Sequence, residues 1–407
     1  PRPLHWRSMP GRRRLPLPAR WTAAIGASIV VVAAAVIATA VIAGRGPSCG
    51  TPAWSQLQGD AAHDGRGQGG AGTLTVRWAR PGEASGGAVL VGDELLVGRQ
   101  GGVLGLSTAD GTERWHWSTP DQKGNNVGPP AVTGCSVGVV ESRPDQPASG
   151  VHAVLHLVSM TSHELVGKGL DIPSASAGGL LAAGSRFELV GGRAESGGVR
   201  WGLYAVEAGS ARASSLAPLA GFTPGPPAAG GDTTYVAAWD NAVQAVSGAG
   251  RQLWRTATTG LPLTAPVLGT GRVMVGTISG ADAFDPGSGR VLWTSTIPSG
   301  VVAAPLPAGD GVLVVDRIFH RLHRLDLATG REIWAVQLGT TLAPPVLVGS
   351  RVITADEQGS LVALDAASGR VLQKLTLRSG VRSPLAVGGG SVYVVGNDGG
   401  VTAVSLG

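Results

Sequence analysis

Two short glycine-containing motifs are the first places where this chain could carry chemistry. Residues 46–50 (GPSCG) match the G-x-S-x-G pattern, which presents a nucleophilic serine on a strand-to-helix turn. Residues 65–70 (GRGQGG) match the G-x-G-x-x-G pattern, which lets a backbone approach the pyrophosphate of a dinucleotide. The first motif follows a long apolar run, and the second lies in a glycine-rich stretch, so neither stands between a strand and a helix. The sequence therefore predicts neither a serine nucleophile nor a dinucleotide site.

A pair of histidines and a pair of cysteines could carry metal or redox chemistry. His152 and His156 would lie on one face of a strand, because side chains alternate along a strand. No third ligand stands near them in the sequence, so we expect a structural role and no metal site. Cys49 and Cys135 are the only cysteines of the chain. In an oxidising compartment they would form a disulfide, and two unpaired thiols are the alternative.

A recurring pattern describes the elements that must position these residues. It consists of a glycine, three residues and then a tryptophan, which a glutamine replaces in the last copy. The copies are residues 111–115, 250–254, 289–293, 330–334 and 369–373. The last four are spaced 39, 41 and 39 residues apart. A period near 40 residues indicates one small unit that is stacked many times.

The pattern predicts four short strands in each unit. In the best-defined copy, residues 272–276 and 281–285 are two strands, residues 285–289 are a turn, and residues 291–293 begin a third strand. Four antiparallel strands per unit, with a bulky residue in the outermost one, are typical of a β-propeller blade. We expect the bulky residues to pack between neighbouring blades: Trp78, Trp115, Trp254, Trp293 and Trp334.

The outer-strand positions predict eight blades. Gln373 marks a sixth position, and two divergent units should place their outer strands near Leu165 and Ala213. The last unit lacks an outer strand, whereas residues 74–78 lack inner strands. We therefore expect an all-β, eight-bladed propeller over residues 73–407, closed by N- and C-terminal strands that share one blade, because closure removes exposed edges.

The repeat resembles that of the pyrroloquinoline-quinone-like (PQQ-like) β-propeller superfamily. The best copies are the Asp-x-x-Ser/Thr-Gly-Arg turns at residues 326–331 and 365–370. Residues 54–65 also resemble the Trp…Gly-Asp…Gly lead-in of that superfamily, so that the resemblance covers about residues 54–407. It implies the fold and leaves function open. The superfamily includes quinoprotein dehydrogenases, non-catalytic BamB-like propellers that bind proteins, and extracellular sensor domains of membrane kinases.

A quinoprotein dehydrogenase that uses pyrroloquinoline quinone and calcium is the enzyme alternative. The resemblance would then require adjacent cysteines, calcium ligands and a catalytic Asp. The chain has no adjacent cysteines, and Asp285, Asp326 and Asp365 are turn residues of the repeat. We therefore expect a non-catalytic binding module without a cofactor: a scaffold, a sensor or an assembly factor. A carbohydrate or cell-wall binder is a further alternative, although only 4% of the residues are aromatic.

The N-terminal region predicts a membrane anchor. Residues 22–44 carry no charge and would span roughly 34 Å as a helix, which is enough to cross a bilayer. The basic residues 1–21 would then stay in the cytosol, and a glycine-rich linker (residues 45–72) and the propeller would lie outside the plasma membrane. A cleaved signal peptide, which would make the protein secreted, is the alternative. Because the sequence begins with Pro1, a fragment of a receptor kinase also stays open.

The charge distribution excludes a nucleic-acid-binding role. The net charge is +5, but seven of the 32 Lys and Arg residues precede residue 50, where no acidic residue occurs. The remainder has 25 basic and 27 acidic residues, which is not the basic footprint that a phosphate backbone requires. We expect a monomer whose partner is a protein or a small extracellular ligand.

The turns between the second and third strands of the blades are the candidate binding surface. In a propeller these turns share one face with the interblade linkers, and most of them here are short and polar. Residues 143–150 and 192–198 are predicted to be long loops. Residues 317–324 lack glycine and gather three Arg, two His and a Phe.

Arginine and aromatic side chains are enriched at protein interfaces, which makes the last of these turns the strongest candidate. We expect a binding surface composed of Arg317, Phe319, His320, Arg321 and Arg382. The alternative is a solvated turn in which Ile318 and Phe319 pack against the next blade.

Overall fold

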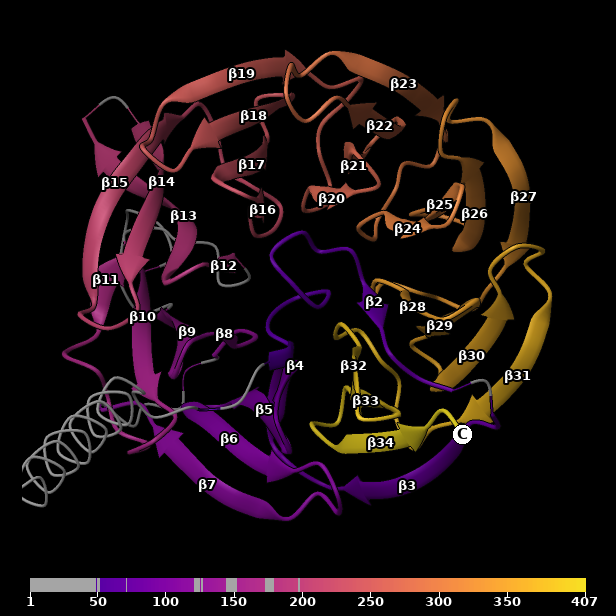
Figure 1. The fold of residues 1–407 in the computed structure, drawn as a ribbon, viewed down its shortest axis with the longest axis horizontal. Coiled ribbons are helices and arrows are strands. Elements are labelled where there is room, and N and C mark those ends of the chain that lie inside the picture. The colour runs from indigo at the N-terminus through magenta and orange to yellow at the C-terminus, as the bar shows by residue number, and fades with distance from the viewer. Residues whose placement is uncertain are drawn as a thin grey trace, which may run out of the picture. The chain divides into compact units, whose positions relative to one another are not determined.

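The computed structural model describes residues 49, 52–70, 72–120, 125, 127–143, 152–172, 179–196 and 198–407. These residues form a closed ring of eight β-sheets, which confirms the predicted all-β, eight-bladed propeller (Figure 1). The first strand of each blade lies nearest to the axis, and the fourth forms the rim. The predicted basic tail (residues 1–21) and transmembrane helix (residues 22–44) lie outside the described residues. Within the described part of the chain, no helix is long and apolar enough to cross a bilayer.

The strands follow one another outward in chain order in seven of the eight blades. Blade 1 comprises β4 (Ala84–Val91), β5 (Glu94–Arg99), β6 (Gly102–Ser107) and β7 (Glu113–Ser118). Blade 2 comprises β8 (Ala131–Thr133), β9 (Ser136–Arg143), β10 (His152–Ser159) and β11 (Leu170–Ile172). Blade 3 comprises β12 (Leu180–Ala183), β13 (Arg186–Glu195), β14 (Gly198–Glu207) and β15 (Arg212–Leu219). Blade 4 comprises β16 (Ala228–Gly230), β17 (Thr233–Ala238), β18 (Ala242–Ser247) and β19 (Gln252–Ala257). Blade 5 comprises β20 (Val267–Gly269), β21 (Arg272–Thr277), β22 (Gly280–Phe284) and β23 (Val291–Thr296). Blade 6 comprises β24 (Leu306–Ala308), β25 (Gly311–Val315), β26 (Arg321–Asp326) and β27 (Glu332–Gln337). Blade 7 comprises β28 (Val346–Val348), β29 (Arg351–Ala355), β30 (Ser360–Asp365) and β31 (Val371–Thr376). Blade 8 comprises β32 (Ala386–Gly388), β33 (Ser391–Val395), β34 (Val401–Ser405) and β3 (Thr75–Arg80).

Blade 8 closes the ring with strands from both ends of the described chain. β3 pairs antiparallel with β34, from Thr75 opposite Ser405 to Arg80 opposite Val401. Figure 1 shows the two strands side by side, β3 in indigo and β34 in yellow. β3 thus supplies the outer strand that the last repeat lacks, and hydrogen bonds hold the ring closed.

A tryptophan on each regular outer strand joins two neighbouring blades. The Trp293 indole donates from Nε1 to the carbonyl oxygen of Leu327 at 2.7 Å, in the turn that precedes the outer strand of the next blade. The same turn contains Gly330, where a Cβ atom would come within 2.7 Å of the Trp293 ring. The equivalent indole bonds run from Trp254 to Pro286 at 2.9 Å, from Trp334 to Ala367 at 2.7 Å and from Trp78 to Thr108 at 3.0 Å.

The recurring Gly-x-x-x-Trp pattern therefore specifies both halves of one interblade contact. Its tryptophan packs on the next blade, and its glycine makes room for the tryptophan of the previous blade, except at Gly250, which lies against the Leu216 backbone of divergent blade 3. A buried indole contributes a large apolar area, and its N–H needs a hydrogen-bond partner, which the turn carbonyl provides.

The pattern changes where the facing turn changes. Trp115 faces the turn of divergent blade 2, in which His163 takes the place of the glycine with a φ of 58°. The two rings stack with their centroids 4.5 Å apart. Gln373 faces blade 8, where the outer strand does not follow β34 in the chain. Its amide accepts a hydrogen bond from the Leu74 N–H at 2.8 Å and donates one to the Gly72 carbonyl at 3.5 Å.

The divergent blades differ in part from the sequence prediction. Ala213 lies in outer strand β15, as predicted, but the outer strand of blade 2 is β11, which begins five residues after Leu165. Leu165 forms only an isolated bridge to Val158. The prediction of a long loop at residues 192–198 is also wrong. β13 and β14 stay paired in one unbroken register as far as Glu195 opposite Gly198, so most of this stretch belongs to the two strands.

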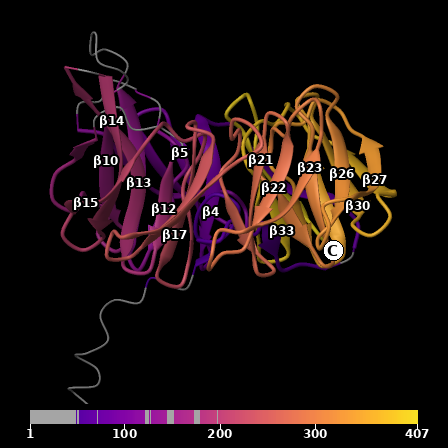
Figure 2. The same cartoon turned by 90° about the horizontal axis from the view of Figure 1, so that it is seen from above.

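The β13–β14 hairpin is longer than its counterparts in the other blades. Its two strands have ten residues each, whereas β17 and β18 of the next blade have six. In the side view of Figure 2, the hairpin rises above the neighbouring blades on one face of the ring. That face is therefore uneven.

A segment that we call the strap (residues 52–70) crosses the middle of the ring (Figure 1). It follows Cys49, which forms a disulfide with Cys135. It pairs with β4 through β1 (Pro52–Trp54) and runs parallel to β28 through β2 (Arg66–Gly67). In between, strap carbonyl oxygens accept backbone hydrogen bonds from the inner strands of blades 2, 4 and 5, donated by Val132, Ala229 and Leu268.

The strap starts on the face that carries the turns between first and second strands. Cys135 lies in the turn between β8 and β9, and Pro52 pairs with Val91 at the end of β4. The turns between second and third strands, including residues 316–320, lie at the other ends of the same strands and therefore on the opposite face.

The glycines of residues 65–70 let the strap lie close to blade 8. A Cβ atom on Gly67 would overlap the Val387 side chain, and one on Gly69 would come within 2.5 Å of Leu406. Close backbone approach to protein therefore accounts for this glycine spacing without a nucleotide.

His63 is a fully buried residue of the strap. Its Nδ1 atom lies 3.3 Å from the carbonyl oxygen of Pro266. Burial lowers the pKa of His63 to about 4, which the hydrogen bond to Pro266 and the nearby Asp60 only partly oppose. The ring is therefore neutral at pH 7 in the folded protein.

Gly330→Ala should destabilise the protein by more than the cost of placing an alanine at the positive φ of this position. The new Cβ would collide with Trp293, so we expect a loss of about 2–4 kcal/mol in the free energy of unfolding, measured by urea titration. Gly309→Ala is the matched control, since Gly309 has a similar φ (66° against 71°) and a Cβ atom added there would meet nothing within 4 Å. This control should lose about 1 kcal/mol. Equal losses would show that the contact with Trp293 is not what requires the glycine.

Acidification should destabilise the protein through His63. The unfolded chain takes up this proton near pH 6.5 and the folded protein only near pH 4, so stability falls as the pH drops through that interval. The loss should total about 3 kcal/mol. His63→Gln should remove this part of the pH dependence of the melting temperature, whereas His116→Gln, at an exposed position, should not. An unchanged pH profile in His63→Gln would contradict the assignment.

Candidate functional site

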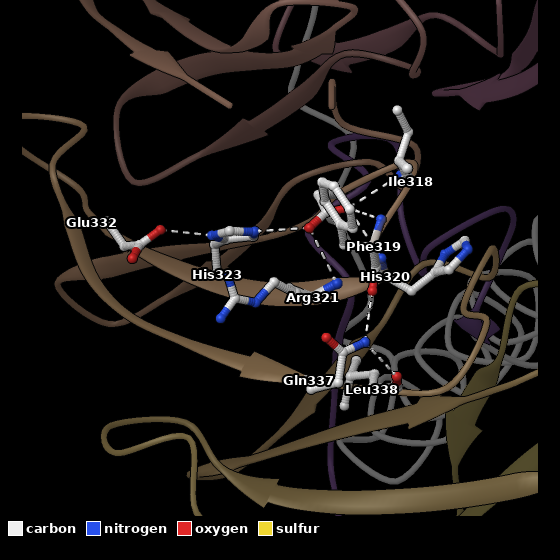
Figure 3. Close-up of polar contacts among 9 residues, drawn as sticks. Ile318, Phe319, His320, Arg321, His323, Glu332, Gln337 and Leu338 are labelled. Carbon is white, nitrogen blue, oxygen red and sulfur yellow. Dashed lines mark hydrogen bonds and ion pairs between the residues drawn. The ribbon is translucent and has the colours of Figure 1, made fainter. Parts of the chain in front are cut away.

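The turn between β25 and β26 is organised by a single buried carboxylate. Asp316 Oδ1 accepts hydrogen bonds from the amides of Ile318, Phe319 and His320 at 3.1, 2.6 and 3.0 Å. Its Oδ2 accepts one from the Arg321 amide at 3.3 Å. Figure 3 shows these amides converging on one side chain. Four consecutive backbone donors are thus satisfied at once, which fixes the shape of the turn.

His323 holds the same carboxylate from the neighbouring strand (Figure 3). Its Nε2 lies 3.2 Å from Asp316 Oδ2, and its Nδ1 lies 2.7 Å from Glu332 Oε2. The ring thus lies between two carboxylates, one from the turn and one from the outer strand of the same blade. Although burial alone would raise it, the pKa of Asp316 is held below its ordinary value by hydrogen bonds from His323 and from the amides of Phe319 and Arg321.

The turn keeps its conformation without a glycine. His320 has a φ of 55°, where the equivalent turns of blades 7 and 8 have Gly359 and Gly399. The His320 carbonyl accepts the Leu338 amide at 3.2 Å, and the Gln337 side chain donates to the Phe319 carbonyl at 2.6 Å. Contacts to the outer strand of the same blade therefore stabilise a conformation that is unfavourable for a residue with a side chain.

The tip of the turn presents apolar side chains to solvent. Ile318 and Phe319 are 55% and 62% exposed. The alternative that these side chains pack against the next blade is therefore wrong, because Asp316 draws the amides inward and leaves the side chains outside. Arg317 and Arg321 are also exposed, and neither has a carboxylate partner among the described residues.

Not all residues of the predicted surface come together. His323 and Arg324 were expected in the turn, but they belong to β26 and are buried, with Arg324 paired to Asp310. Arg382 lies in the linker between blades 7 and 8, where its Nε is 2.7 Å from Glu357 Oε1. The structure thus groups Arg317, Phe319 and His320 in one turn, with Arg321 next to them at the start of β26, and places Arg382 in the linker between two other blades.

A pocket of about 150 Å³ lies beside this turn, between blades 6 and 7. Gln337 and Leu338 line it from blade 6, and Thr354 and Lys374 line it from blade 7. The Thr354 hydroxyl is buried and has no hydrogen-bond partner. Sequence reasoning missed this pocket because its walls come from segments that are far apart in the chain.

Phe319 also belongs to a series of exposed apolar side chains that we call the apolar arc: Val199, Trp239, Ile278, Ile318 and Phe319. They lie at or beside the turn between second and third strands in blades 3, 4, 5 and 6, and all are at least 43% exposed. The corresponding turns of blades 7, 8 and 1 present polar residues at 357–358, 397–398 and 100. The exposure of these side chains depends on how each turn packs, so the sequence alone did not reveal the arc.

The other candidate chemistry has structural roles or lies outside the described residues. His156 Nε2 is 2.8 Å from Glu141 Oε2, and both residues are buried; His152 lies on the same strand. Cys49 of the G-x-S-x-G motif is in the disulfide, and Ser48 lies outside the described residues. In the part of the chain that the structure describes, no three His, Cys, Asp or Glu side chains converge to hold a metal ion.

Comparison with known proteins identifies similar propellers. The family model described as outer membrane protein assembly factor BamB matches residues 156–300, 240–319 and 318–406, which together exceed half of the chain. A protein of that name from Burkholderia pseudomallei (strain K96243) is 30% identical over 187 residues, which is 40% of this chain and 49% of the relative. The chain therefore matches about half the length of that relative.

Two solved structures show the same fold at low sequence identity. BamB from Moraxella catarrhalis has a TM-score of 0.63 at 15% identity, covering 82% of this chain and 100% of that one. Quinohemoprotein alcohol dehydrogenase from Comamonas testosteroni has a TM-score of 0.64 at 13% identity, covering 87% of this chain and 80% of that one. Structural likeness at these identities shows the propeller fold alone.

Asp316→Ala should loosen the turn and destabilise the protein. Four amides and His323 would lose their acceptor, so we expect a loss of about 3 kcal/mol in urea titrations and faster hydrogen exchange in peptides that cover residues 316–321. Asp398→Ala is the matched control, because Asp398 lies in the equivalent turn of blade 8 and accepts one amide, from Gly400.

The contribution of Asp316 should also depend on pH. Its folded pKa is below the unfolded value, so its stabilisation is present above about pH 4 and is lost as the pH falls through the folded pKa. Wild type and Asp316→Ala should therefore converge in stability at low pH. A similar loss in Asp316→Ala and Asp398→Ala would contradict the organising role of Asp316.

Proposed function

Because this chain belongs to the BamB-like family of PQQ-like β-propellers, we propose that it acts as a non-catalytic module that binds another protein. The name of the relatives, outer membrane protein assembly factor, supports a role in which protein contacts rather than catalysis matter. In this chain that role would be a scaffold, sensor or assembly function.

The observation that carries the proposal is the exposed turn at residues 316–321. A large aromatic side chain that is 62% exposed costs free energy in water unless a partner covers it. The turn beneath it is held by four hydrogen bonds from backbone amides to the buried Asp316 carboxylate, so Phe319 is presented on a rigid support. Rigid aromatic anchors flanked by Arg are typical of protein interfaces.

The disulfide supports a location outside the cytosol. Cys49 and Cys135 are bonded, and such bonds persist in oxidising compartments. We propose that the propeller works in an extracytoplasmic space, held at the membrane if residues 22–44 are an anchor and released if they are a cleaved signal.

A quinoprotein dehydrogenase is the competing function. The propeller fold is shared with such enzymes, as the likeness to the Comamonas protein illustrates. Against it, the described residues do not supply a donor set for calcium, and the two cysteines bond to each other across 86 residues instead of standing side by side. We therefore propose a module that works without a bound cofactor.

Site-specific photo-cross-linking tests the binding role. With a benzophenone amino acid in place of Phe319 in the full chain, cells that produce the protein should yield a discrete protein adduct on irradiation. The same replacement of Ile333, which is 51% exposed on the outer strand of the same blade, is the control and should give little or none.

Two results would count against the proposal. Equal adducts, or none, at both positions would show that the Phe319 face is not a protein-binding surface. A saturable rise in melting temperature on titration with pyrroloquinoline quinone and calcium would favour the dehydrogenase, because a ligand that binds only the folded state stabilises it.

A further inference from the structure

The exposed large apolar side chains of the described residues fall into two groups. Five lie on outer strands, in five different blades: Val76, Leu253, Val291, Ile333 and Val371. The other five are the apolar arc, which occupies one face of four consecutive blades. Scattered apolar side chains are normal on a protein surface, whereas a series of them at the equivalent turns of successive blades points to an interaction site.

Two members of the arc, one in blade 4 and one in blade 6, are aromatic side chains that are held in place. In blade 4, Trp239 packs edge-on against Phe222 with their ring centroids 4.9 Å apart, and Phe222 in turn packs against Trp201 at 5.4 Å. Trp239 is still 48% exposed. In blade 6, Phe319 stands on the turn held by Asp316. Side chains that are already ordered lose little entropy on binding, so both suit a role as anchors.

The charges around the arc are not balanced. In blades 3 and 4 the acidic side chains are neutralised, since Glu195 pairs with Arg200 and Asp240 pairs with Arg255. In blade 6 the Asp316 carboxylate is engaged by the turn amides and His323, which leaves the exposed Arg317 and Arg321 without an acidic partner among the described residues. The pocket between blades 6 and 7 contains Lys374 and also Asp356, whose carboxylate already accepts the backbone amides of Gln358 and Ser360.

The shape of the face favours a protein segment over a lipid surface. The β13–β14 hairpin rises above the neighbouring blades at one end of the arc, so a flat bilayer could not contact the whole arc (Figure 2). At the other end, the pocket of about 150 Å³ has room for one apolar side chain, with Leu338 in its wall and Lys374 among its lining residues. Anchor side chains in small pockets are typical of protein recognition.

We propose that the apolar arc and the pocket beside Phe319 bind a segment of a partner protein in which apolar side chains are flanked by Asp or Glu. The apolar side chains cover Trp239 and Phe319 and fill the pocket, and the carboxylates pair with Arg317, Arg321 and Lys374. This inference rests on the proposed protein-binding function and adds the chemistry of the partner, through charge complementarity.

Four matched probes test the proposal with the full chain. The first is a fluorescein-labelled peptide that combines Leu and Phe with Asp and Glu. The second replaces its acidic residues by Lys, the third replaces its Leu and Phe by Ser, and the fourth is a vesicle of phosphatidylglycerol and phosphatidylcholine. We expect saturable binding of the first probe only, weakened several-fold by raising the salt concentration, because salt screens exposed charges.

Variants locate the binding on the arc. Phe319→Ser should weaken binding of the acidic-apolar peptide by about ten-fold, and Arg321→Glu should weaken it and reduce its salt dependence. Ile333→Ser, at an exposed apolar position on the rim of the same blade, should bind like wild type. Unchanged melting temperatures in all three variants would show that the fold is intact.

The outcomes separate this inference from the function on which it rests. Equal binding of the Lys peptide, binding of vesicles alone, or no binding of any probe would overturn the proposed partner chemistry. If cross-linking at position 319 still captures a protein, the binding function stands with a partner of different chemistry. If cross-linking at position 319 also gives nothing, the proposed function fails as well.

Discussion

The contact between a tryptophan of one blade and a turn of the next is the interaction on which the ring depends. The indole donates to a turn carbonyl and lies where a Cβ atom of the turn glycine would be, so both residues must be present in neighbouring repeats. This requirement explains why the two residues recur together along the chain. It also explains the exceptions, because Trp115 meets His163 in a divergent turn and Gln373 meets the closure between β3 and β34. Each departure from the pattern coincides with a change in what the side chain faces.

The contacts that hold the ring leave one set of turns free for binding. The tryptophan contacts lie at the turns before the outer strands, and the strap binds the inner strands. The turns between second and third strands take part in neither, so they can differ between blades without opening the ring. In blade 6 this freedom is used for an exposed Phe319, but the turn has its own support in Asp316, His323 and the outer strand. A variable turn on a fixed scaffold is a common way for loops to carry function.

The fold was far more predictable from the sequence than the site. The period near 40 residues and the missing strands at each end predicted eight blades and their closure, because these follow from local patterns and counting. The outer strand of blade 2 and the β13–β14 hairpin were missed, since neither has the Gly-x-x-x-Trp pattern and both depend on pairing with a neighbour. Phe319 was predicted from composition, but its exposure depends on Asp316, which no pattern in the sequence singled out. The arc was missed because the exposure of Trp239 and Ile278 depends on the packing around each turn, and no sequence pattern distinguishes these side chains from the buried apolar residues of the adjacent strands.

The disulfide has a mechanical consequence for the propeller. A pull on the chain at Cys49 is transmitted to Cys135 and into the turn between β8 and β9 through a covalent bond. The strap therefore carries no tension. Without the disulfide, its hydrogen bonds to the inner strands would break one after another. Without this bond the same force would peel β1 from β4 and then draw the strap out of the ring. Because Cys135 and the apolar arc are on opposite faces, a propeller under tension would also orient itself with the arc facing away from the direction of the pull.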